Sequence, residues 1–198
     1  MFVEESAWLR DHLASLPLAS AARVLDIGSQ SIEFRTVRQP WIERNIHAPI
    51  RDRGAAIVNV DLRDAPGIDV VADVTDPGFD AAAVGVFDLV LCCNLLEHVT
   101  DRETTLRNVR QLVGHRGYLA VTVPGHFPYH ADPIDTMYRP SPRQLVSDVN
   151  AIDSEMQVIG RGSVGCLDRA YYLSRKSRVR RWVPPLRWRT SCALLQRR

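Results

Sequence analysis

Side chains that can move a proton gather in one short stretch of this sequence. Residues 124–146, "PGHFPYHADPIDTMYRPSPRQLV", contain His126 and His130, and another histidine, His98, follows Glu97 earlier in the chain. Histidine titrates near neutral pH, so it can remove a proton from a hydroxyl group. We take His130, His126 and His98, in that order, as candidate catalytic bases. From the same stretch we expect substrate contacts by Tyr129, Asp132, Asp135 and Arg139.

These residues also have a structural interpretation. The prolines of the stretch could simply stiffen a loop in which Asp135 and Arg139 form an ion pair. His98 could likewise be held by a hydrogen bond to Glu97. Catalysis is favoured only if the fold brings these groups together beside a ligand site.

Four apolar runs, typical of buried strands, end in polar residues. Residues 23–28 end with Asp26 and Gly28, and the runs 55–62, 68–73 and 87–94 end near Asp61, Asp73 and Asn94. One such acid taken separately is more often a helix cap than a ligand contact. Several at successive ends of parallel strands meet in one crevice, where such sheets bind ligands. An acid after the second strand suits ribose hydroxyls, and glycine lets the backbone approach a ligand closely.

The elements around these runs predict an α/β fold. Helical spacing predicts helices over residues 2–16, 102–113 and 143–150, and short helices broken at Pro40 and Pro49. Further strands are expected over 117–125, 155–160 and 169–174. Strands that alternate with helices predict a doubly wound, mainly parallel sheet. We expect one domain over residues 1–175, with an N-terminal helix within 1–17 and a substrate loop at 124–142, followed by a basic tail at 176–198.

The loop after the first strand argues against a dinucleotide cofactor. Gly28 is followed by Ser29, Gln30 and Ser31, so the G-x-G-x-x-G fingerprint is missing, and Asp61 lies 33 residues beyond Gly28 rather than about 20. A loop that holds no pyrophosphate can do without those glycines. The pattern favours a cofactor that contains a nucleoside but no phosphate.

Four segments together resemble the class I S-adenosylmethionine-dependent methyltransferases: "VLDIGSQS", "VNVDLRD", "VVADVTD" and "FDLVLCCNLLEHVTDRETTLRNVRQLVGHRGYLAVTVPG". The resemblance covers residues 20–175 and implies a seven-stranded Rossmann-like sheet with S-adenosyl-L-methionine as cofactor. It also implies cofactor contacts by Asp26, Gly28, Ser29, Asp61, Leu62, Asp73, Val74, Asn94 and Leu95. Family members commonly read G-x-G-x-G, and this chain keeps only the first glycine. Bulk at the later positions could narrow the pocket.

A looser resemblance concerns the acceptor. The stretch "HADPIDTMYR" is similar to a loop of methyltransferase-like proteins encoded beside enzymes that build sugars and polysaccharides. It implies O-methylation of a hydroxyl on a glycan or a related small molecule. The alternative is a catalytically silent methyltransferase-like module that binds a partner through its basic tail, which the missing glycines favour.

A metal-dependent variant is also weighed. Some methyltransferases carry E-x-x-E-H after the fourth strand, where these side chains hold a divalent ion. Here Asn94 replaces the first carboxylate before Glu97 and His98, which leaves a hard-cation site short of charge. The sequence therefore predicts no metal.

Charge and cysteine content bear on location. Ten of the 25 Lys and Arg residues lie within 169–198, which holds no acid, so the first 168 residues carry 15 basic and 23 acidic side chains, a net charge of −8. The tail could be solvated, could touch anionic lipid or, least favoured, could bind nucleic acid. The four cysteines suggest buried thiols in a reducing compartment. We expect a cytoplasmic protein that the tail could bring to a membrane surface.

Overall fold

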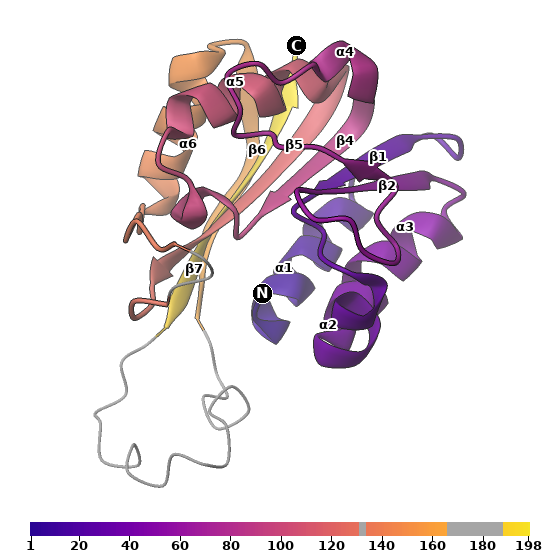
Figure 1. Ribbon diagram of the computed structural model, residues 1–198, viewed down its shortest axis with the longest axis horizontal. Coiled ribbons are helices and arrows are strands. Elements are labelled where there is room, and N and C mark those ends of the chain that lie inside the picture. Colours follow the sequence, from indigo (N-terminus) through magenta and orange to yellow (C-terminus); the bar gives the residue numbers. More distant parts are fainter. Residues whose placement is uncertain (131–133, 166–187) are drawn as a thin grey trace, which may run out of the picture.

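Seven strands form one twisted sheet at the centre of the molecule (Figure 1). A computed structural model describes residues 1–130, 134–165 and 188–198. The strands are β1 (Arg23–Ile27), β2 (Ala56–Asp61), β3 (Val70–Val71), β4 (Phe87–Cys93), β5 (Val113–His126), β6 (Met156–Gly165) and β7 (Arg189–Arg197). Their order is β3-β2-β1-β4-β5-β7-β6. The first five run parallel, and β7 is antiparallel to both neighbours. The predicted α/β sheet is confirmed.

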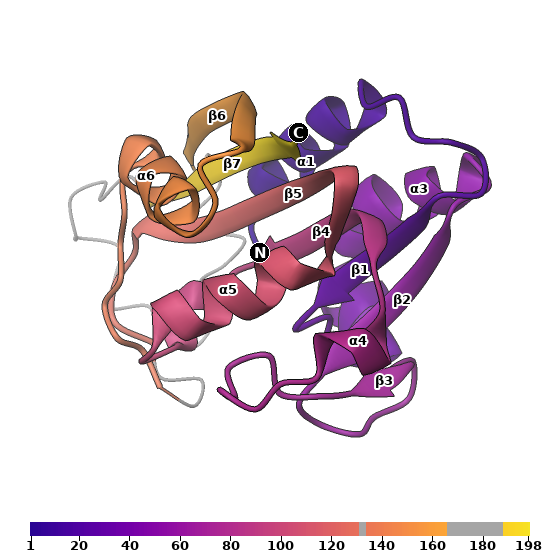
Figure 2. The same cartoon turned by 90° about the horizontal axis from the view of Figure 1, so that it is seen from above.

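Helices cover both faces of the sheet (Figure 2). On one face lie α1 (Val3–Ala14), α2 (Pro40–Ile42), α3 (Ala48–Asp52) and the π-helical turns at Phe34–Arg38 and Glu43–His47. On the other lie α4 (Ala81–Val84), α5 (Arg102–Leu112) and α6 (Pro142–Ile152). Leu106, Val109 and Leu112 of α5 pack into the core. Asp101 begins this helix by accepting the Thr104 N–H at 3.0 Å.

The predicted break at Pro40 is confirmed, and the predicted break at Pro49 is wrong. The π-helical turn Phe34–Arg38 ends at Gln39, whose backbone is not helical (φ −130°, ψ 65°), and Pro40 begins α2. Pro49 lies in the first turn of α3, directly after the π-helical turn Glu43–His47. Proline is tolerated in a first turn because its missing N–H has no intrahelical acceptor there. The chain stays helical from Pro40 to Asp52, although the turns change type.

The prediction of a tail over 176–198 is wrong for its last part. Residues Arg189–Arg197 form β7, which pairs with β5 on one side and β6 on the other. Leu194 faces the core beneath α1, and Leu195 faces the core beneath α5 and α6. An apolar run buried on both faces is typical of an interior strand, so these leucines and the buried Trp188 cannot face lipid. The predicted strand at 169–174 and residues 175–187 lie outside the described residues.

Other observations bear on the predicted location. Cys92, Cys93 and Cys192 are free thiols, and burial raises the pKa of Cys92 to about 12.

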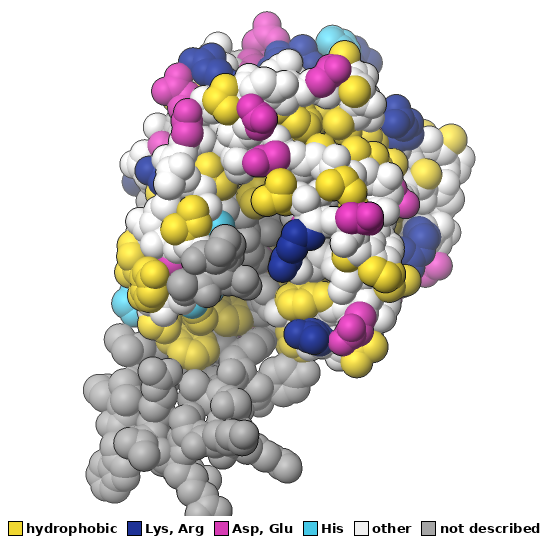
Figure 3. Space-filling model, in the orientation of Figure 1, with side chains coloured by type: hydrophobic (Ala, Val, Ile, Leu, Met, Phe, Trp, Pro, Cys, Tyr) yellow, Lys and Arg dark blue, Asp and Glu magenta, His cyan; other side chains and the backbone are white. Residues whose placement is uncertain are grey.

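On the face in Figure 3, acidic side chains lie among basic ones rather than apart from them. Within the described part of the chain, no helix has the length and apolarity that crossing a membrane requires.

Candidate active site

The carboxyl ends of the central strands meet at one edge, as the sequence predicted. The amides of Gly28 and Ser29, just after β1, donate to the Val60 carbonyl of β2 at 2.8 and 3.2 Å. Leu95, just after β4, lies beside Gly28, because a Cβ there would come within 3.6 Å of the Leu95 Cδ1. The ends of β1, β2 and β4 therefore enclose one region.

The glycine-poor loop keeps a glycine-like backbone. Gly28 has φ +67°, and Gln30, at the second glycine position, has φ +61°, a conformation that L-residues seldom adopt. Two contacts hold Gln30 there: its N–H donates to the Asp61 Oδ2 at 3.0 Å, and its carbonyl accepts from the Arg35 Nη1 at 2.9 Å. Arg35 is buried and also donates to the carbonyls of Ser29 and Gly67. Sequence reasoning missed Arg35, whose acceptors are all backbone atoms.

Replacing Gln30 with glycine tests this strain. We expect Gln30→Gly to raise the free energy of unfolding by about 0.5–1 kcal/mol, because glycine adopts positive φ without the steric cost. Ser31→Gly is the matched control and should lower it, because Ser31 is absent from the positive-φ residues and its hydroxyl accepts the Phe34 N–H. Urea denaturation measures both. A less stable Gln30→Gly protein would show that the loop is unstrained.

Each strand-end acid has a partner within the protein. The Asp61 carboxylate accepts the N–H groups of Gln30 and Arg63, both at 3.0 Å. The Asp73 Oδ1 accepts the Thr75 N–H at 2.8 Å within a turn rather than at a helix N-terminus, because the next helix, α4, has Asp80 as its N-cap. The Asp26 Oδ2 lies 2.8 Å from the Nε2 of His47, a buried histidine that sequence reasoning missed.

The other predicted cofactor residues differ in accessibility. Leu62 is 64 % exposed beside Asp61, whereas the Val74 side chain is buried in the core. Ser29 carries a buried hydroxyl that has no hydrogen-bond partner among the described residues. Buried polar atoms usually find a partner, so this hydroxyl marks a place where a ligand group would fit.

Asn94 belongs to a polar network that joins the N-terminal helix to the sheet. Its Nδ2 donates to the Glu5 Oε1 at 2.7 Å, and the Thr122 Oγ1 donates to the same oxygen at 2.6 Å. The other Glu5 oxygen accepts from the Thr190 Oγ1 of β7 at 3.2 Å. Glu5 is buried, and no local pattern could have shown that it reaches three strands.

Two of the three candidate histidines lie together. The rings of His98 and His130 meet edge to face with centroids 5.2 Å apart. The His98 Nε2 is 3.7 Å from the Oε1 of Glu97, a carboxyl whose pKa burial raises to about 8. Burial lowers the pKa of His130, whose Nδ1 lies 3.2 Å from the Asp135 Oδ2. Asp135 also accepts from Arg139 at 2.6 Å, so the ion pair weighed for these two residues forms.

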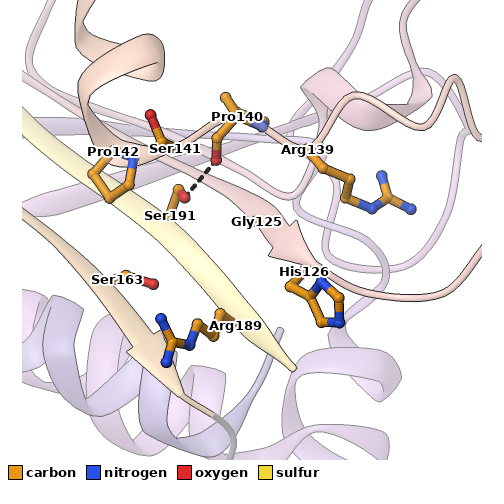
Figure 4. A pocket seen from close by; sticks show the side chains of 9 residues that line it. All are labelled: Gly125, His126, Arg139, Pro140, Ser141, Pro142, Ser163, Arg189 and Ser191. Carbon is orange, nitrogen blue, oxygen red and sulfur yellow. Dashed lines mark hydrogen bonds between the residues drawn. The ribbon is translucent and has the colours of Figure 1, made fainter. Parts of the chain in front are cut away.

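His126 lies in a neighbouring pocket at the ends of β5 and β7 (Figure 4). The pocket holds about 530 Å³. Six polar residues line it, His126, Arg139, Ser141, Ser163, Arg189 and Ser191, together with Gly125, Pro140 and Pro142. The Arg189 side chain lies near Ser163, and Arg139 points away, toward its partner Asp135. Tyr129 is exposed, and Asp132 lies outside the described residues.

Comparison with known proteins identifies the family. The profile described as "Methyltransferase domain" matches residues 4–154. The chain belongs to this family. S-adenosylmethionine is therefore its cofactor, as the sequence predicted. No curated protein matches the chain.

Solved structures of other methyltransferases share the fold of this chain. An S-adenosylmethionine-dependent methyltransferase from Mesorhizobium loti has a TM-score of 0.59 at 14% identity, covering 97% of this chain and 98% of that one. The Burkholderia thailandensis 1,6-didemethyltoxoflavin-N1-methyltransferase has a TM-score of 0.56 at 17% identity, covering 97% of this chain and 76% of that one. Coclaurine N-methyltransferase has a TM-score of 0.62 at 12% identity, covering 97% of this chain and 72% of that one.

Proposed function

We propose that this methyltransferase transfers a methyl group from S-adenosylmethionine to a hydroxyl of a sugar-containing or related small molecule. The observation that carries the proposal is the pair His98 and His130, which meet beside the buried Glu97 and next to a pocket lined by hydroxyl and cationic groups. Such a lining suits an oxygen-rich acceptor, which needs many hydrogen-bond partners.

The residues at the strand ends fit the cofactor. Gly28 and the unpartnered Ser29 hydroxyl would hold its methionine part, and Asp61 with the exposed Leu62 would hold its ribose. Asp26 lies in β1, just before this loop, and its carboxylate is held by the contact with the His47 Nε2. The adenine would lie against Asp73 and the backbone of Val74, and Asn94 and Leu95 would line the remaining wall. When bound, the cofactor supplies a methyl group on a sulfonium, an excellent leaving group.

The chain's own residues would then align the acceptor and remove its proton. Alignment is worth most when the acceptor is held rigidly; we assign it to the pocket that contains His126, Ser163 and Arg189. Proton removal belongs to His98 and His130, whose rings are in contact. Arg139 and Asp135 keep His130 in place, because the Asp135 Oδ2 accepts the His130 backbone N–H at 2.9 Å.

Two observations count against a silent binding module. Arg35 and Asp61 hold the glycine-poor loop in the backbone conformation that glycines would adopt, so the missing glycines do not remove the loop. Part of the basic tail, on which that alternative relies, is the interior strand β7. Both observations favour the enzyme.

Calorimetric titration with S-adenosylmethionine tests the cofactor site. We expect micromolar binding by the natural chain and about tenfold or weaker binding by Asp61→Ala, because buried acceptors for ribose hydroxyls are lost. Asp61→Asn should fall between them, since it keeps one acceptor oxygen. Asp64→Ala, an exposed acid three residues away, is the control. Unchanged affinity in Asp61→Ala would place the ribose elsewhere.

Turnover on soluble glycans tests the acceptor site. Release of S-adenosylhomocysteine should depend on a hydroxylated acceptor. We expect His130→Ala to lower turnover by about a hundredfold, a usual contribution of proton transfer, with cofactor affinity unchanged. Full turnover in His130→Ala would remove this residue from the mechanism, and a lack of turnover on every hydroxylated acceptor would overturn the proposed function.

A further inference from the structure

Three potential metal donors converge from two distant segments. Glu97 and His98 lie in the 3-10 turn after β4, and His130 lies in the loop after β5. One donor atom from each lies within 4.8 Å of the others. The segment around Asn94 alone is short of charge for a metal, and no spacing in the sequence links it to His130, which lies 32 residues beyond His98. The fold therefore adds His130 as a third donor to Glu97 and His98.

Two buried atoms of this cluster make no hydrogen bond. The Glu97 Oε2 and the His130 Nδ1 are inaccessible and form no hydrogen bond with any described residue, although the Nδ1 lies 3.2 Å from the Asp135 Oδ2. Glu97 as a whole is 1 % exposed. Leaving a buried polar atom unpaired costs about 1–3 kcal/mol, so such atoms usually have a functional reason or an unseen partner. Here two of them lie in one cluster.

The surrounding contacts orient the donors. The His98 Nδ1 lies 2.5 Å from the Ile134 carbonyl, to which it donates its proton, and this leaves a lone pair on the Nε2 that faces Glu97. Thr136 ties the two segments together, because its N–H and hydroxyl both donate to the Glu97 carbonyl, at 2.9 and 3.0 Å. Histidines that bind metals typically donate their other ring N–H to a backbone carbonyl in this way.

We propose that Glu97, His98 and His130 bind one divalent transition-metal ion. Two imidazole nitrogens and one carboxylate oxygen suit zinc, cobalt, manganese or iron(II) and leave coordination positions open. Magnesium and calcium prefer shells made mostly of oxygen. An acceptor hydroxyl on the open positions would lose its proton to solvent water more readily, with His98 and His130 acting as ligands rather than free bases; this role rests on the proposed function, whereas binding of the ion does not.

Titration with Co²⁺, followed by its visible absorption and without cofactor or acceptor, tests the site. We expect one ion per natural chain and at least tenfold weaker binding in Glu97→Gln and His130→Asn. His115→Ala, which removes an exposed histidine at the other end of β5, should bind as the natural chain does. The lack of binding of Co²⁺, Zn²⁺ and Mn²⁺ at millimolar concentration, or equal binding in all variants, would overturn the proposal.

Melting temperatures measured with and without Zn²⁺ separate a loss of metal binding from a defect in folding. Zn²⁺ should raise the melting temperature of the natural chain, because a ligand that binds only the folded state stabilises it. His130→Asn, whose side chain is partly exposed, should fold and show no such rise. A chain that binds no ion yet methylates a glycan would overturn the metal site alone. A chain that binds the ion but methylates no hydroxylated acceptor supports the site and overturns the proposed function alone.

Discussion

A chain that ends at residue 188 is expected to remain unfolded. Removing residues 189–198 deletes β7, which lies between β5 and β6 and pairs with both. Leu194 and Leu195 are fully buried on opposite faces of the sheet, and burying two leucines contributes about 3–6 kcal/mol. Because β6 would also lose its only neighbour in the sheet order, the total loss approaches the whole stability of a domain, about 5–15 kcal/mol. Circular dichroism and urea denaturation measure it.

Two smaller changes show whether the loss of β7 itself causes the unfolding. Leu195→Ala should lower the free energy of unfolding by about 2–5 kcal/mol through the cavity it leaves. Removing only Arg198, which lies beyond β7 and is exposed, should change stability little. If the chain 1–188 unfolds cooperatively at the denaturant midpoint of the natural chain, β7 does not stabilise the sheet.

The fold was predictable wherever a local pattern carried it. Apolar runs located β1, β2 and β4, and helical spacing located α5. β7 was missed because its apolar centre, residues 191–195, is short and lies in the segment with ten basic residues. The prediction gave that charge more weight than the apolar run. A basic residue at the end of a strand can find an acceptor within the protein, as the Arg197 Nη1 does by donating to the Val113 carbonyl at 2.7 Å.

The site was predictable only where the topology gathers residues. Strand ends meet in any parallel sheet, so Asp61 and Gly28 could be placed together from the sequence. Arg35, His47 and Glu5 could not, because their partners are far along the chain or are backbone atoms. The same limit hid the approach of His130 to Glu97, which depends on the course of one loop.

Glu5→Ala should destabilise the protein by about 3 kcal/mol or more. The Glu5 carboxylate is the shared acceptor of Asn94, Thr122 and Thr190, which follow or belong to β4, β5 and β7. Its removal leaves up to three buried donors unpaired, and each costs about 1–3 kcal/mol. It also removes the acceptor of the Phe2 N–H at the start of α1. Urea denaturation measures the change.

The controls separate this network from a general effect on α1. Asp11→Ala, an exposed position of the same helix, should change stability by no more than about 0.5 kcal/mol. Glu5→Gln should cost less than Glu5→Ala, because the amide oxygen still accepts from some donors. A loss in Glu5→Ala no larger than that in Asp11→Ala would show that the donors find other partners. Since Asn94 lines the proposed cofactor wall, the destabilised variant should also bind S-adenosylmethionine more weakly, which would make the N-terminal helix a support of the site.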